Sequence, residues 1–266
     1  MPVVEDRLFR KIKKLVGRAV ADFNLLEEGD RVAVAVSGGK DSYTLLHILE
    51  SLRRRAPVRY ELVAVNVHPG FPGYRTAPLE QHLRAHGFAC RMEQTDCYQI
   101  IETKRRPGSS YCSFCARLRR GVLYSIADQL GCNKIALGHH LDDFIETLLL
   151  NQFFVGTLKA MSPKLLADNG RHTVIRPLVY VEERDIAEFS YTNDFSIIAC
   201  GCPAGKDGDR NRQRMKRLVK DLSIEIPHLR GSLIGALANV QPRHLLDKQL
   251  KDFEFHPPAI MENLSE

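Results

Sequence analysis

Long apolar runs are missing from this 266-residue sequence. No run approaches the roughly 20 residues that a membrane span needs, and the first 20 residues contain no apolar core of a signal peptide. These residues instead predict an amphipathic surface helix, with Leu8, Ile12, Leu15 and Val16 on one face. We also find no internal repeat and no low-complexity tract. We therefore expect a cytoplasmic protein that does not enter a membrane.

A strong charge of either sign is also absent. Lysine and arginine total 38 against 32 acidic residues, and this net charge of +6 permits a nucleic-acid partner without requiring one. The hydrophobic share of 44% is ordinary for a soluble globular protein. Seven cysteines without a signal peptide indicate a reducing compartment, where thiols bind metals or take part in chemistry.

Short β-branched runs alternate with segments of helical spacing. Residues 31–36 and 62–67 are typical of buried strands, and residues 88–92 and 134–137 predict two more. Helical spacing follows them at 43–52, 79–86, 118–130 and 144–154. This alternation predicts an α/β fold with a parallel sheet, in which ligands bind at the carboxyl ends of the strands.

A glycine turn, Ser37-Gly38-Gly39-Lys40-Asp41-Ser42, follows the first predicted strand. Two glycines allow a tight turn whose N–H groups face an anion, and the next helix adds its dipole. Lysine and serine side chains supply further donors. The spacing matches neither the Walker loop nor the dinucleotide fingerprint. A plain strand-to-helix turn is the simpler alternative, but the coincidence of strand, glycines, lysine, aspartate and serines favours a phosphate site.

The pattern Ser-Gly-Gly-x-Asp-Ser resembles the signature of the PP-loop, or N-type, ATP pyrophosphatases. The resemblance implies that residues 37–42 hold the β- and γ-phosphates of ATP and leave the α-phosphate open to attack. An adenylated substrate would form, and pyrophosphate and AMP would be released. The resemblance also implies that Asp41 helps to hold Mg²⁺ and that Val65, Asn66 and Val67 touch adenine.

A second polar element, Gly138-His139-His140-Leu141-Asp142-Asp143, follows the fourth predicted strand. Such a cluster binds metal or nucleotide or performs acid–base chemistry, and its carboxylates also suit the first turn of a helix. It resembles the Gly-His-x-x-Asp-Asp element of PP-loop enzymes that modify tRNA. The resemblance implies that Gly138 and His139 lie beside ATP and that Asp143 serves magnesium or catalysis, with Asp142 and Asp41 as further catalytic candidates. Arg176-Pro177-Leu178 resembles another element of the family and implies that Arg176 faces the nucleotide.

The cysteines leave three kinds of site open: zinc, an iron–sulfur cluster or a redox pair. Cys112 and Cys115 form a C-x-x-C that we expect on a loop just before a helix, and Cys200 and Cys202 form a later C-x-C. These four could make a zinc site, although structural zinc pairs usually have two to four residues between their ligands, so C-x-C fits less well.

Residues 112–124, 138–143, 161–170 and 197–202 together resemble the tRNA 2-thiocytidine synthetase (TtcA) family, and the similarity runs roughly from Leu8 to Asp247. The resemblance implies a [4Fe–4S] cluster held by Cys112, Cys115 and Cys202. Cys200 is the alternative third ligand, because this sequence is one residue shorter here than the usual C-x-x-C of the family. Related 2-thiouridine synthetases carry extra zinc-binding C-x-x-C pairs near their ends, and none occurs here.

Basic residues gather in local clusters, most of which are expected to be solvated faces. Two of them are candidates for contact with tRNA: one directly after the C-x-x-C, and one that crowds a single predicted helix with few acids. The candidates are Arg117, Arg119, Arg120, Arg210, Arg212, Arg214, Lys216 and Arg217.

The family resemblance implies an enzyme that uses MgATP to convert the cytidine at tRNA position 32 to 2-thiocytidine, with the cluster carrying sulfur from a cysteine desulfurase or from free sulfide. We expect a homodimer, with a helical segment at 1–30, a PP-loop domain at 31–202 and a basic helical segment at 203–266. The alternatives are a PP-loop enzyme that forms 2-thiouridine, lysidine or an amide, and a nucleotide-binding module with structural zinc.

Overall fold

The computed structural model describes residues 3–106, 108, 110–198, 202 and 210–246. In this part of the chain, no helix combines the length and the apolar character needed to cross a membrane.

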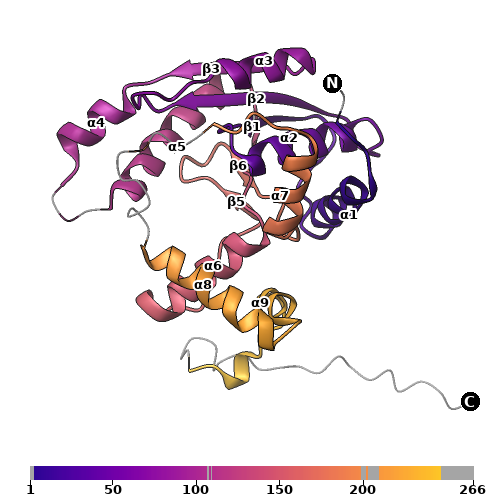
Figure 1. Ribbon diagram of the computed structural model, residues 1–266, viewed down its shortest axis with the longest axis vertical. Coiled ribbons are helices and arrows are strands. Elements are labelled where there is room, and N and C mark those ends of the chain that lie inside the picture. Colours follow the sequence, from indigo (N-terminus) through magenta and orange to yellow (C-terminus); the bar gives the residue numbers. More distant parts are fainter. Residues whose placement is uncertain (1–2, 107, 109, 199–201, 203–209, 247–266) are drawn as a thin grey trace, which may run out of the picture.

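The centre of the molecule is a six-stranded sheet with the order β3-β2-β1-β4-β6-β5 (Figure 1). Its strands are β1 Asp30–Ala35, β2 Tyr60–His68, β3 Cys90–Gln94, β4 Lys134–Ala136, β5 Lys164–Leu166 and β6 Thr173–Ile175. Strand β1 pairs in parallel with both β2 and β4, so the chain runs outward from β1 in two directions. Only the edge strand β5, among the described strands, is antiparallel to its neighbour. The sheet therefore has its switch point between β1 and β4, where open α/β sheets bind ligands.

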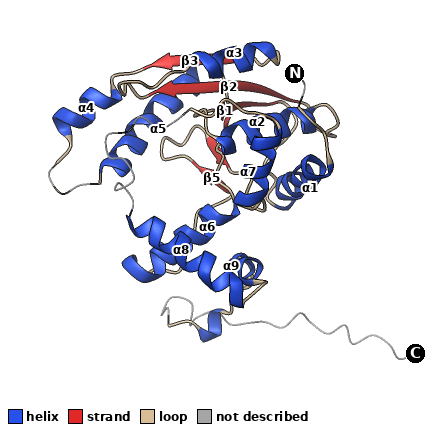
Figure 2. Cartoon of the chain, viewed as in Figure 1, coloured by secondary structure: helices blue, strands red, loops and turns tan. Residues whose placement is uncertain are grey.

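Helices connect the strands and cover both faces of the sheet (Figure 2). They are α1 Arg7–Asp22, α2 Lys40–Arg53, α3 Ala77–Ala85, α4 Cys97–Lys104, α5 Tyr111–Gln129, α6 Leu141–Leu150, α7 Glu183–Thr192, α8 Arg210–Glu225 and α9 Leu229–Ala238. A π-helical turn, Asn151–Val155, extends α6, and a short 3-10 helix spans Pro242–His244.

Alternate residues of β1 pack into different hydrophobic clusters. Val32 and Val34 belong to a large cluster that they share with α1, α2 and α7, whereas Ala33 belongs to a smaller cluster shared with α5. This alternation places α5 on the opposite face of the sheet from α2. A third cluster joins α6 to α8 through Ile145, Leu149 and Met215. The C-terminal helices are therefore attached to the helix that follows β4.

The sequence predictions of a parallel α/β fold and of four strands are confirmed, and β5 and β6 were not expected. One local prediction is wrong: the C-x-x-C does not lie on a loop before a helix, because α5 begins at Tyr111. The Ser110 side chain accepts a hydrogen bond from the Ser113 backbone and caps the helix there. Cys112 and Cys115 thus stand one turn apart on one helix.

Candidate active site

The Ser37–Ser42 turn lies at the carboxyl end of β1 and leads into α2. Gly38 has a φ of +80°, which favours glycine, and its carbonyl accepts a 2.9 Å hydrogen bond from the Ile198 backbone. A Cβ at Gly38 would approach the Ile198 side chain to 2.5 Å. Gly39 is the N-cap of α2 and has no side chain that could cap the first turn. The N–H groups of that turn are therefore available to an anion.

The two serines of the turn hold its shape. The Ser42 hydroxyl donates to the Gly39 carbonyl at 2.8 Å and accepts from the Ser37 backbone N–H at 3.2 Å. From outside the turn, the Tyr74 hydroxyl donates to the Ser37 carbonyl at 2.8 Å. These bonds fix the loop before any ligand arrives, which is the kind of preorganisation that electrostatic catalysis requires.

Lys40 lies between two carboxylates. Its Nζ is 3.0 Å from Asp41 Oδ1 and 3.2 Å from Glu183 Oε1 at the start of α7. Burial opposes the charge on Lys40, but the two carboxylates outweigh it and raise its pKa above the ordinary value. Burial also opposes the charge on Glu183, and hydrogen bonds and charges from Lys216 and Lys40 still lower its pKa to about 2. The loop therefore presents a permanently charged lysine.

The Gly138–Asp143 element packs directly against this turn. A Cβ at Gly138 would lie 3.2 Å from the backbone carbon of Asp41, so glycine allows the two loops to meet. Asp143 caps α6 by accepting from the His140 backbone at 3.0 Å, and its other oxygen pairs with Arg212 of α8. His140 Nε2 lies 3.8 Å from Asp41 and 3.5 Å from Asp143. Two carboxylates from different strand ends therefore flank one imidazole.

His139 and Arg176 form the other side of this region. Arg176 Nε donates to His139 Nδ1 at 3.1 Å, and its terminal nitrogen donates to the Ser162 carbonyl at 2.6 Å. Burial, with the adjacent Arg176 charge, lowers the pKa of His139 to about 4. His139 is therefore neutral at pH 7 and carries its proton on Nε2.

These elements line a cavity of about 620 Å³, a size that suits a small-molecule ligand. We call it the nucleotide cavity, because residues predicted to bind ATP line it. Eight of the twelve residues predicted to bind ATP line it, and Asp143 joins them: Ser37, Asp41, Ser42, Val65, Val67, Gly138, His139 and Arg176. The lining does not include Asn66, which is buried and donates to the Val36 carbonyl at 2.6 Å. Asn66 thus ties β2 to β1 behind the cavity.

Asp142 faces away from the nucleotide cavity. One of its oxygens accepts from the Glu183 backbone at 2.7 Å, and the other accepts from Arg230 of α9 at 2.8 Å. It is buried and lines a separate cleft with Lys216. The adjacent aspartates Asp142 and Asp143 therefore face two different cavities.

The cysteines gather at the start of α5. Cys115 is buried with Phe71 and Ile101, and Cys202, 87 positions later, packs against the same cluster. Cys112 is exposed one turn before Cys115 on α5. Cys200 lies outside the described residues. Ala116, which follows Cys115 directly in α5, lines the nucleotide cavity.

The predicted tRNA-binding residues, seven arginines and Lys216, divide into three groups. Arg119 and Arg120 line the nucleotide cavity, and the buried Nε of Arg119 has no hydrogen-bond partner within the described residues. In α8, Arg212 pairs with Asp143 and Glu146, and Lys216 pairs with Glu183. The remaining four residues are exposed and do not line the cavity: Arg117, Arg210, Arg214 and Arg217.

Three residues at the site were not predicted. Glu183 holds Lys40, Glu146 holds Arg212, and Ile198 closes on Gly38. Each of these residues lies in an apolar or acidic segment of ordinary composition, and no sequence motif marks it as a site residue. Only the packing of α7 and α8 against α2 and α6 brings these side chains to the loop.

The comparisons with known proteins agree with this geometry. Residues 4–221 match the PP-loop domain family. A tRNA-cytidine(32) 2-sulfurtransferase from Syntrophotalea carbinolica is 76% identical over 95% of this chain and 98% of its own length. One from Geotalea uraniireducens is 65% identical over 94% of this chain and all of its own length.

Among solved structures, the U34-tRNA thiolase NcsA from Methanococcus maripaludis, with its [4Fe-4S] cluster, has a similar fold. The TM-score is 0.70 at 20% identity, over 88% of this chain and 80% of that one. This likeness concerns the fold, whereas the near-complete match to the sulfurtransferases concerns the family. The chain belongs to the PP-loop proteins and, within them, to the tRNA-cytidine(32) 2-sulfurtransferase family.

Proposed function

We propose that this chain is an enzyme that uses ATP to replace the C2 oxygen of cytidine 32 in tRNA with sulfur, releasing AMP and pyrophosphate. One observation carries the proposal beyond family membership. Helix α5 bears Cys112 and Cys115 in its first two turns, and the following residues Ala116, Arg119 and Arg120 line the cavity beside the glycine turn. This arrangement supports a reaction in which an RNA base is activated in the cavity and sulfur is supplied from the cysteines at the start of α5.

The adenylating half of the reaction follows from the loop. The Ser37–Ser42 amides and Lys40 would bind the β- and γ-phosphates, and Arg119, whose Nε is buried at the cavity, would face the nucleotide. Asp41 and Asp143 are the carboxylates that would hold Mg²⁺, which would offset phosphate charge. The cytidine O2 would attack the α-phosphorus while pyrophosphate leaves. The oxygen then belongs to AMP, a good leaving group.

Thiolates from Cys112, Cys115 and Cys202 would hold a [4Fe–4S] cluster. The donor set fits, because the two α5 cysteines are one turn apart and Cys202 packs into the same apolar cluster as Cys115. Three protein ligands leave one iron open, at which sulfide could be carried. The attack of sulfide on C2 forms the C–S bond and breaks the C–O bond to AMP, so no net oxidation or reduction occurs at the base.

The remaining assignments concern partners and organisation. We propose that tRNA contacts the exposed arginines of α5 and α8 and that a cysteine desulfurase or free sulfide supplies sulfur. We propose that the reaction takes place in the cytoplasm, which a tRNA substrate and reduced thiol ligands support, and that the chain forms a homodimer. We also propose the division into a helical segment at 1–30, a PP-loop domain at 31–202 and a basic helical segment at 203–266.

The test is anaerobic purification of the chain, followed by iron, sulfide and zinc analysis and an assay of AMP release with tRNA and sulfide. We expect iron and sulfide near four per chain, as [4Fe–4S] requires, and AMP release that depends on both tRNA and sulfide. One zinc per chain on the thiols without iron would exclude the mechanism. ATP binding without pyrophosphate release would indicate a regulatory module instead.

Cysteine substitution sharpens the test. Cys202→Ala should lose the cluster and the thiolation activity but retain ATP binding, because Cys202 does not line the nucleotide cavity. Cys90→Ala, in strand β3, is the matched control and should retain iron and activity. A Cys202→Ala protein with a full complement of iron would transfer the ligand role to Cys200.

A further inference from the structure

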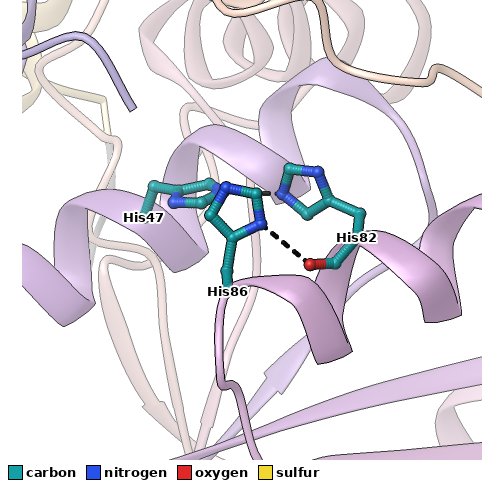
Figure 3. Close-up of side chains that lie close together, drawn as sticks. All are labelled: His47, His82 and His86. Atoms are coloured by element: carbon teal, nitrogen blue, oxygen red, sulfur yellow. Dashed lines mark hydrogen bonds between the residues drawn. The ribbon is translucent and has the colours of Figure 1, made fainter. Parts of the chain in front are cut away.

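Three histidines that the proposed reaction does not use converge between α2 and α3. Figure 3 shows the His47 ring from α2 beside the rings of His82 and His86 from α3 and its C-cap. One nitrogen of each ring can be chosen so that all three lie within 4.8 Å of one another. None of the three lines the nucleotide cavity.

The hydrogen bonds of the rings fix part of their chemistry. His86 Nδ1 lies 2.8 Å from the His82 carbonyl oxygen, which can only accept, so Nδ1 carries a proton and a metal would bind at Nε2. Histidines that bind metals commonly donate their second N–H to a backbone carbonyl in this way. His47 Nε2 and His82 Nε2 are 2.8 Å apart, so a single proton lies between two nitrogens.

An apolar shell surrounds the rings. The Phe88 and Phe195 ring centroids lie 5.2 and 5.3 Å from that of His47, whose side chain is buried. Burial, with the adjacent imidazoles, lowers the pKa of His47 to about 3 and that of His82 to about 4. Both rings are therefore neutral at pH 7, the form in which imidazole binds a metal.

We propose that His47, His82 and His86 form a Zn²⁺ site, with water as the fourth ligand. Three convergent imidazoles suit zinc, which takes nitrogen ligands in tetrahedral geometry. At the usual Zn–N length, tetrahedral ligand nitrogens lie about 3.3 Å apart. The His47–His82 pair would therefore open by only about half an ångström as zinc replaces the proton between them.

The site has both an access route and a structural consequence. His47 and His86 line a cleft of about 390 Å³ together with Glu50 and Phe88, so an ion could reach the rings from solvent. Bound zinc would fasten α3 to α2, the helix whose first turn belongs to the ATP loop. Zinc should therefore stabilise the fold without entering the reaction.

The experiment must separate imidazole ligands from thiol ligands. We would use the full-length variant Cys112→Ser/Cys115→Ser/Cys202→Ser, which lacks the thiol ligands. A chelator removes bound metal, ZnCl₂ is added and the excess ion is removed. The zinc content and the thermal midpoint of the protein are then measured. We expect one zinc per chain and a higher midpoint. Adding His86→Gln should weaken zinc binding by at least about tenfold, the smallest loss expected when even a supporting residue of a metal site is removed.

The control is His228→Gln in the same background, because His228 is exposed at the start of α9. It should bind zinc as tightly as the background protein. Zinc content and midpoint shift that survive His86→Gln would overturn the site, as would a folded background protein that binds no zinc. If the triple-serine background fails to fold, X-ray absorption of the zinc-loaded wild-type chain decides: a nitrogen and oxygen shell supports the site, and sulfur alone refutes it.

Discussion

The two adjacent aspartates of α6 have the same chemistry in the sequence and different partners in the structure. Asp143 lines the nucleotide cavity, and Asp142 instead accepts hydrogen bonds from Arg230 and the Glu183 backbone. The difference arises because successive residues in the first turn of a helix point about 100° apart. One carboxylate therefore faces the loop, and the other faces the C-terminal helices.

Asp143→Asn should reduce the rate of AMP release by at least about 100-fold, the scale at which removal of one preorganised electrostatic group acts. Its thermal midpoint should stay close to that of the wild type. Asp142→Asn should do the opposite: it should lower the unfolding free energy by about 1–3 kcal/mol, as expected for a disturbed buried hydrogen-bonded charge, and retain more turnover. Single-turnover AMP release and denaturant unfolding measure the two effects, and equal losses of rate would contradict the division of roles.

Residue types were predictable at this scale, but the choice of partner was not. The glycine turn and the Gly138–Asp143 element predict an anion site, because few other sequence patterns place glycines and polar donors directly after a strand. Glu183, by contrast, lies in an ordinary acidic helix start, and only its 3.2 Å approach to Lys40 gives it a role. Asn66 shows the reverse case, since a polar residue at a strand end bonds the neighbouring strand instead of facing the cavity.

Helix α8 presents two different basic faces. Met215 and Val219 pack towards α6, and Arg212 and Lys216 reach acids beside the loop. Arg214 and Arg217 are exposed and form no such ion pair within the described residues. In the sequence these basic residues form a single cluster. In the helix they point in different directions, so Arg212 and Lys216 pair with acids whereas Arg214 and Arg217 face solvent, where phosphates could reach them.

Arg214→Ala/Arg217→Ala should therefore weaken tRNA binding and reduce the dependence of log K on log salt concentration by about 2, roughly 1 for each lost phosphate contact. ATP binding should not change. Filter binding of tRNA over a range of salt concentrations measures the effect. The matched control is Arg7→Ala/Lys14→Ala, which removes the same charge from exposed positions of α1. An equal loss in the control would mean that net charge, not α8, governs the binding.

Helix α5 illustrates why element boundaries are hard to predict around a C-x-x-C. Residues 105–110 are rich in glycine, proline and serine, and the apolar spacing becomes clear only from Leu118. The helix nevertheless begins at Tyr111, because Ser110 caps it and because Cys115 is buried beside Phe71 and Ile101. A tertiary contact, absent from local sequence, extends the helix by two turns.

At the scale of the whole molecule, the N-terminal helix belongs to the main core. Phe9, Ile12 and Val16 are fully buried in the same cluster as the apolar face of α2, and the Phe9 ring lies 5.8 Å from that of Phe189 in α7. The amphipathic pattern at residues 8–16 predicted a surface helix correctly, but it did not reveal which element the helix covers. Because α2 begins at the ATP loop, α1 supports the active site from behind.

We therefore expect Phe9→Ala to lower the unfolding free energy by about 3–5 kcal/mol, the usual cost of emptying a buried aromatic site. Since α1 shares its core with α2 and α7, denaturant should still unfold the chain in one transition, with an unchanged slope of free energy against denaturant. Val4→Ala, at an exposed N-terminal position, should change stability by less than about 0.5 kcal/mol. A separate early transition in Phe9→Ala, with the ATP-binding signal intact, would instead make α1 an independent appendage. Urea titrations followed by circular dichroism and by nucleotide binding distinguish these outcomes, because only an integrated α1 links its loss to that of the ATP site.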